Sequence, residues 1–79
     1  MASFNEVIAE MIVLLNKGAS RDARMGAAVG LGRAGGPAAV QALRVVMHNA
    51  RTGEERGAAA AALGEILGRG QPADLAEPE

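Results

Sequence analysis

The sequence predicts an all-α fold in which two antiparallel helical hairpins stack on each other, followed by a disordered C-terminal tail. Three observations lead to this prediction. Apolar residues recur at helical spacing in four segments. Capping residues and glycines separate these segments, and no segment has the alternating, β-branched pattern of a strand. The chain of 79 residues is long enough for one domain.

The first helix is predicted to begin at Ser3. Ser3 and Glu6 have the spacing of a capping box, in which each side chain binds the backbone N–H of the other residue. Large apolar residues follow at helical spacing and predict a buried stripe: Phe4, Ile8, Met11 and Leu15. Gly18 is expected to end this helix.

The second and third helices are separated by two glycines. Ser20 is expected to cap the second helix, which runs to about Ala34 before Gly35 and the next glycine break it. Pro37 suits the first turn of the third helix, where its missing N–H has no cost. The third helix is expected to end near Ala50. Its inner stripe consists of Val40, Leu43, Val46 and Met47.

The fourth helix and the tail follow. Thr52 and Glu55 have the spacing of a second capping box, and Gly68 is expected to close the helix that they open. Residues 69–79 differ in composition, because they contain two Pro, three acidic residues and only Leu75 as a large apolar residue. We therefore predict that residues 69–79 form a flexible acidic tail.

An internal repeat of 32 residues relates the two predicted hairpins. The shift places the segment 24–32 on the segment 56–64 with the same Arg, Ala, Leu and Gly positions, and it places Ser20 on Thr52. Residues 1–68 are thus one domain of two repeats, at about 3–35 and 36–68. A repeat of this length is typical of a helical solenoid, in which each unit buries its apolar face against the next one.

The repeat resembles a known family. The pattern Arg-x-Ala-Ala-x-x-Ala-Leu-Gly, followed by Gly-x-Pro-x-Ala-Val-x-x-Leu, looks like the HEAT-like repeat of the phycobilisome-lyase type. The first part matches Arg56, Ala58, Ala59, Ala62, Leu63 and Gly64, and the second matches Gly35, Pro37, Ala39, Val40 and Leu43. The likeness covers residues 6–68, although Arg44 stands where an apolar residue is common. The resemblance implies a short HEAT-like α-solenoid that serves as a protein-binding scaffold.

Composition excludes several classes of function. The chain has no Cys, which rules out disulfides, a Cys nucleophile and a Cys-ligated metal. Eight basic residues face nine acidic ones, so the near-neutral charge argues against nucleic acid as a partner. No apolar run approaches the roughly 20 residues of a membrane span, and the N-terminus lacks the charge of a signal peptide. We expect a cytoplasmic protein with no membrane contact.

The residues that could carry chemistry are few. His48 is the single His, and we interpret it as a surface or helix-end residue rather than a metal ligand. The glycines between residues 30 and 35 superficially echo a phosphate-binding loop, but the required Lys-Ser/Thr pair and the preceding strand are missing. We expect no enzyme activity, no metal and no cofactor.

Four apolar residues are candidate partner contacts. Val13 and its repeat counterpart Val45 lie opposite the inner stripes of their helices. On the second helix, Met25 and Val29 point away from its inner residues. Either the face with the two valines or the face with Met25 and Val29 is expected to meet a partner.

Arg24 and Arg56 are candidate partner contacts as well, since they are counterparts in the two repeats. They could line one surface and contact an acidic partner. The interpretation that we favour is that they bridge carbonyl groups or acidic side chains within the repeats.

The sequence thus favours a non-catalytic protein–protein interaction module, an adaptor, scaffold or accessory subunit that binds a protein partner. Nearly half of its apolar residues are Ala, which bury little area, so a homo-oligomer, a dimer, would add the missing burial. The alternative is an accessory factor of the lyase type for a chromophore- or cofactor-handling enzyme. A third interpretation is a piece of a longer repeat array.

Overall fold

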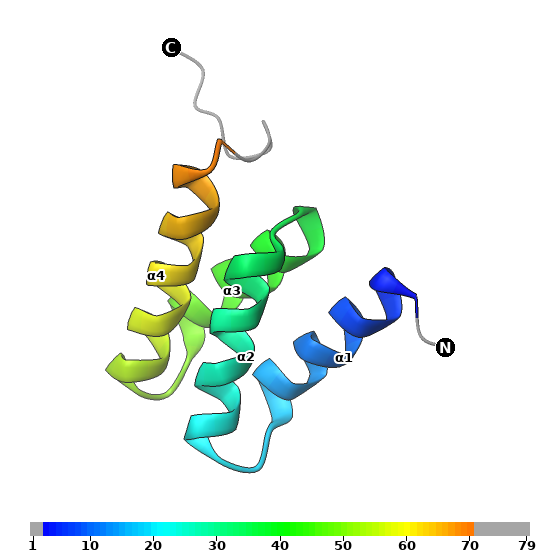
Figure 1. Cartoon of the computed structure of the whole chain (residues 1–79). Helices are drawn as coiled ribbons and strands as arrows, with labels where there is room; N and C mark the ends of the chain where they lie inside the picture. The colour runs from blue at the N-terminus through cyan, green and yellow to red at the C-terminus, as the bar shows by residue number, and fades with distance from the viewer. Residues whose placement is uncertain (1–2, 71–79) are drawn as a thin grey trace.

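A computed structural model describes residues 3–70 as four α-helices (Figure 1). They are α1 (Phe4–Lys17), α2 (Arg21–Ala34), α3 (Pro37–Asn49) and α4 (Gly53–Gly68). No strand occurs within this range, so the predicted all-α fold and the four predicted helices are confirmed. Of the predicted tail at 69–79, positions 71 onward lie outside the described residues.

Local capping explains where the helices begin. Ser3 and Glu6 form the complete capping box, with Ser3 N donating to Glu6 Oε1 over 2.7 Å and Glu6 N donating to Ser3 Oγ over 3.1 Å. Thr52 Oγ1 accepts from Glu55 N over 3.1 Å in the same way. The Glu55 carboxylate, however, binds other groups, so the second predicted capping box is only half formed.

The helices pack as two hairpins, α1 with α2 and α3 with α4, and the hairpins join mainly where α2 lies along α4 (Figure 1). Leu31, Leu43 and Ile66 are fully buried at the centre of the core. Small side chains surround these three residues, which allows the helix backbones to approach closely. The other buried hydrophobic residues of the core are Ile8, Leu15, Ala27, Ala28, Ala39, Val40, Val46, Ala59, Ala62 and Leu63.

The helices α2 and α4 approach each other closely at Gly32. A Cβ atom placed on Gly32 would lie 2.7 Å from the Cβ of Ala62, closer than two such atoms come in proteins. The Gly32 carbonyl also accepts a hydrogen bond of 2.7 Å from Arg69 Nη2. Arg69, predicted as the first residue of the tail, therefore belongs to the folded domain.

The predicted buried stripe of α1 needs one correction. Ile8 and Leu15 are buried and Met11 is half-buried, but the Phe4 side chain is 68% exposed. Phe4 lies in the first turn of α1, which no other element in the described part of the chain covers. Helical periodicity alone therefore placed this residue in a core that does not reach it.

Candidate interaction surfaces

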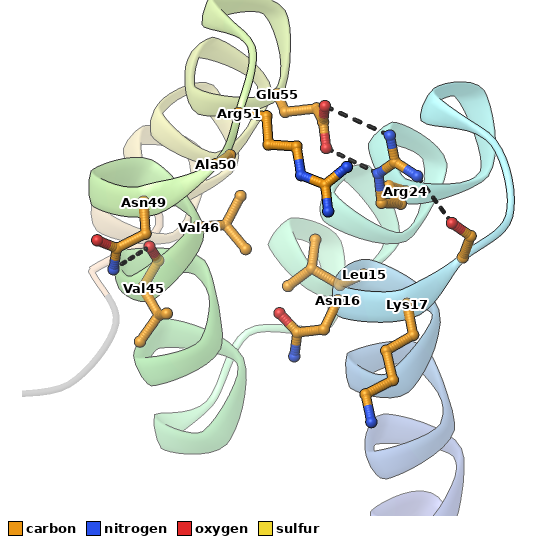
Figure 2. Close-up of a pocket in the computed structure, with 11 residues that line it drawn as sticks. Leu15, Asn16, Lys17, Arg24, Val45, Val46, Asn49, Ala50, Arg51 and Glu55 are labelled. Atoms are coloured by element: carbon orange, nitrogen blue, oxygen red, sulfur yellow. Dashed lines mark hydrogen bonds and ion pairs between the residues drawn. The ribbon is translucent and has the colours of Figure 1, made fainter.

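The junction between the two hairpins is built around Arg24. Its Nε donates to Glu55 Oε1 over 2.8 Å, and its Nη1 donates to the carbonyl oxygen of Gly18 over 2.8 Å (Figure 2). One guanidinium therefore connects the α1–α2 turn, α2 and the first turn of α4. An adjacent ion pair, Arg21 with Glu54, crosses the same junction near its exposed rim.

Glu55 is the one buried charged residue among the described positions. Its carboxylate accepts hydrogen bonds from Arg24 and, over 3.0 Å, from the Thr52 hydroxyl. These bonds favour the charged form, first through Arg24 and then through Thr52, and they lower the pKa of Glu55 below its ordinary value. The buried charge is thus matched by a cation and a donor that fix its geometry.

Arg56 repeats half of this arrangement. Its Nη1 donates to the carbonyl oxygen of Ala50 over 2.7 Å, six residues earlier in the chain, as Arg24 does to Gly18. The two arginines therefore hold the two hairpin turns in the same way. Within residues 3–70, no acidic side chain forms an ion pair with Arg56.

A groove of about 360 Å³ opens between the two hairpin turns, at the C-terminal ends of α1 and α3 (Figure 2). Buried Leu15 and Val46 contribute apolar surface to it, and the exposed cations Lys17 and Arg51 line it. Neither cation forms an ion pair with the described residues. The groove is suited to binding an apolar side chain that is accompanied by acidic groups.

The structure does not bring the two candidate valines together. Val45 lines the groove, whereas Val13 is exposed on α1 and does not line it. Met25, expected to point outward, is half-buried and lines a small cavity beside Leu15 and Val46. Val29, expected to point outward together with Met25, is exposed on α2.

One end of the molecule exposes an apolar surface that sequence reasoning missed. Phe4, Val7 and Leu14 of α1 are 68%, 40% and 42% exposed. The counterparts of Val7 and Leu14 in the second repeat, Ala39 and Val46, are buried. We define the N-terminal edge as the exposed residues Phe4, Val7, Glu10 and Leu14 of α1 and Asp22 of α2.

The opposite end repeats the surface with which α2 meets α4. Arg24, Ala28 and Gly32 follow each other along α2 at intervals of four residues, and Arg56, Ala60 and Gly64 repeat them along α4. Those of α2 lie at the junction, whereas those of α4 are exposed. We define the C-terminal edge as the exposed residues Arg44 of α3 and Arg56, Ala60, Gly64 and Leu67 of α4.

Within residues 3–70, no three His, Asp or Glu side chains come together in a way that could hold a metal ion. His48 is exposed on α3, away from the groove lining. None of the four described helices has the length and apolarity needed to cross a membrane.

No family model, curated protein or solved structure matches this chain.

The exposed apolar surface of the N-terminal edge, which sequence reasoning missed, could have been found from the repeat itself. Comparing each apolar residue with its counterpart 32 positions away separates the residues that the neighbouring hairpin covers from those at a free end of the stack. The chain's fold and the two uncovered edges therefore carry the functional argument.

Proposed function

We propose that this protein is a non-catalytic protein–protein interaction module, a small adaptor, scaffold or accessory subunit that also self-associates, and that it acts in the cytoplasm. The observation that carries the proposal is the N-terminal edge. Val7 and Leu14 expose apolar surface at positions whose counterparts in the second repeat are buried, and the exposed Phe4 extends this surface. An apolar surface of this kind favours association with another folded chain.

The proposed relation to HEAT-like repeats rests on the correspondence between the hairpins. Ser20 and Thr52 cap α2 and α4, and Arg24 and Arg56 bind the carbonyl six residues earlier, each pair separated by 32 positions. Such correspondence supports two copies of one structural unit, because capping and turn contacts recur together with the sequence pattern. Repeat units of this type present extended surfaces that bind other proteins.

Absolute mass in solution tests the proposal. Light scattering on a sizing column across a dilution series is expected to give a mass above that of the 79-residue monomer at high concentration. The double variant Phe4→Ser and Leu14→Ser should stay monomeric and keep its helical circular dichroism, because both side chains are exposed. A wild-type monomer at every concentration would contradict self-association. A pigment absorbance in protein purified from its host would favour the alternative role as a chromophore-related accessory factor.

A further inference from the structure

We propose that the protein assembles head to tail, so that the C-terminal edge of one copy binds the N-terminal edge of the next copy. In this arrangement the contact between copies repeats the contact between the two hairpins within one chain. The inference rests on the proposed self-association and adds which surfaces meet.

The small residues of the C-terminal edge are those of an existing junction. Within the chain, Gly32 allows α4 to approach α2 so closely that Ala62 fills the space of a missing Cβ. Its counterpart Gly64 has no atom within 4 Å of the place where its Cβ would be. One repeat further on, Gly64 would meet the counterpart of Ala62, which is Gly30 of the next copy. Both positions are Gly, so no two Cβ atoms overlap there, and the Met11 side chain, whose Sδ lies 3.1 Å from the place of a Gly30 Cβ, would border the contact.

The charges of the two edges are complementary. At the internal junction the cations Arg21 and Arg24 lie on the first hairpin and their acidic partners lie on the second. Shifted by one repeat, the C-terminal edge presents Arg56, the counterpart of Arg24. The N-terminal edge presents Asp22, the counterpart of Glu54. The internal ion pairs are not repeated residue for residue, because Arg56 would face Ala23 and Asp22 would face Gly53. The C-terminal edge is nevertheless basic and the N-terminal edge acidic, as the two sides of the junction are within the chain.

A second pair of opposite charges on the two edges corresponds to an apolar pair inside the chain. Ile12 of α1 and Ala42 of α3 are half-buried against the core, on helices that contact each other. Their counterparts on the free edges are Arg44 and Glu10, which are both exposed. Arg44 stands where the first repeat has the apolar Ile12, and an opposing Glu10 from the next copy accounts for it.

The exposed apolar residues also coincide in this arrangement. Gly35 and Gly36 are adjacent, and their positions in the neighbouring repeats are Leu67 and Phe4. A one-repeat shift therefore brings Leu67 of one copy to the start of α1 in the next copy. The same shift places Gly68, the counterpart of Gly36, on Phe4, so the last residue of α4 must turn away for Leu67 and Phe4 to meet. Leu67 is 50% exposed and Phe4 is 68% exposed in the single chain. Their contact would remove Phe4, the largest exposed apolar side chain, from water.

A symmetric pair of N-terminal edges explains less. It would cover Phe4, but it would also bring the acidic residues Glu10 and Asp22 of two copies to one interface, where like charges oppose association. It would leave Leu67 and the arginines of the C-terminal edge uncovered. A head-to-tail contact satisfies both edges at once, and it gives open chains of copies because the two surfaces differ.

The close approach of the next copy at Gly64 is tested by the variant Gly64→Gln, with Ala61→Gln as the matched control. Both positions are exposed on α4, but the counterpart of Ala61, Val29, is exposed and does not form the internal junction. Gln is a better helix former than Gly, so Gly64→Gln should stabilise the monomer. Sedimentation velocity is expected to show that Gly64→Gln raises the concentration for half-assembly by about tenfold or more, as expected for the loss of about 1.4 kcal/mol. Ala61→Gln should leave that concentration unchanged.

The proposed pairing of Arg44 with Glu10 of the next copy is tested by reversing the charge of each residue. Arg44→Glu alone and Glu10→Arg alone should each assemble more weakly than wild type, because each places like charges at the contact. An equimolar mixture of the two variants should recover assembly, since opposite charges then meet at every contact between unlike copies. The double variant should recover it as well.

The outcomes separate the two proposals. The head-to-tail contact is supported if Gly64→Gln assembles weakly and if the equimolar mixture of Arg44→Glu and Glu10→Arg recovers assembly. A closed dimer that Phe4→Ser disrupts, but Gly64→Gln and Arg44→Glu leave intact, overturns the head-to-tail contact and keeps self-association. A wild-type protein that is monomeric at every concentration overturns both.

Discussion

Gly32 and Ala62 mark a close approach of the two hairpins, with room for only one Cβ between the two backbones. The pair sits where α2 and α4 run alongside each other, so its fit decides how deeply the hairpins pack. Gly64, the counterpart of Gly32, faces open space on the other side of α4. The same residue type therefore serves two different environments 32 positions apart.

This contrast predicts opposite effects of one substitution. Gly32→Ala should destabilise the domain by about 1–3 kcal/mol, because the added methyl group overlaps Ala62 and forces the helices apart. Gly64→Ala should stabilise the monomer by up to about 1 kcal/mol through helix propensity. Urea unfolding followed by circular dichroism, at a concentration where the chain is monomeric, measures both changes. Changes of the same sign in the two variants would show that the hairpins do not pack this closely.

Glu55 predicts a loss of stability in acid. Its pKa is lower in the folded state than in the unfolded chain, chiefly through Arg24 and then Thr52, so it stabilises the fold above the ordinary pKa of glutamate, about 4.3. The contribution is lost as the pH falls below that value toward the lowered pKa. Glu6, whose pKa the Ser3 backbone N–H lowers, acts in the same direction.

The Glu55→Gln variant should therefore be less stable than wild type at pH 7, and its stability should fall less as the pH is lowered from 5 to 3. Thermal unfolding across this range measures the difference. Glu65→Gln is the control, because Glu65 is exposed and its nearest cation, Arg69, lies 4.0 Å away. Identical pH profiles for Glu55→Gln and wild type would exclude the Arg24 contact as a source of stability.

The caps of α2 and α4 should differ in strength. Ser20 Oγ only accepts from Ala23 N, over 3.0 Å, whereas Thr52 accepts from Glu55 N and donates to the Glu55 carboxylate. Replacing a cap by Ala costs about 0.5–2 kcal/mol. We expect Thr52→Ala to lie near the upper end and Ser20→Ala near the lower end in chemical denaturation. Equal losses would mean that the hydroxyl contributes nothing to the position of Glu55.

Substitution of Val13 and Val45 tests positions outside the two edges. Val13 and Val45 are exposed and belong to neither edge, so the double variant Val13→Ser and Val45→Ser should change the free energy of unfolding by less than about 0.5 kcal/mol per site. Its assembly should match that of wild type in sedimentation velocity. Loss of assembly with the fold intact would place the contact between copies on the face with the two valines.

The sequence predicted what depends on neighbouring residues. Helix ends followed from Ser3, Ser20, Thr52 and the glycines because capping is decided within one turn of the chain. It did not predict that Phe4 is uncovered or that Glu55 is held by Arg24. The exposure of Phe4 follows from its place at the free end of the stack, which helical periodicity alone does not show. The Arg24 contact depends on how the second hairpin is placed on the first, which residues 31 positions apart in sequence do not reveal.

The bonds of Arg24 have a consequence for how the domain opens. Stacked repeats can unfold one unit at a time when each contacts its neighbour weakly. Here a single side chain joins the α1–α2 turn to the first turn of α4, so fraying of either segment removes the partner of the other. Native-state hydrogen exchange should therefore give the buried amides of α2 and α4 the same opening free energy, that of one cooperative unit.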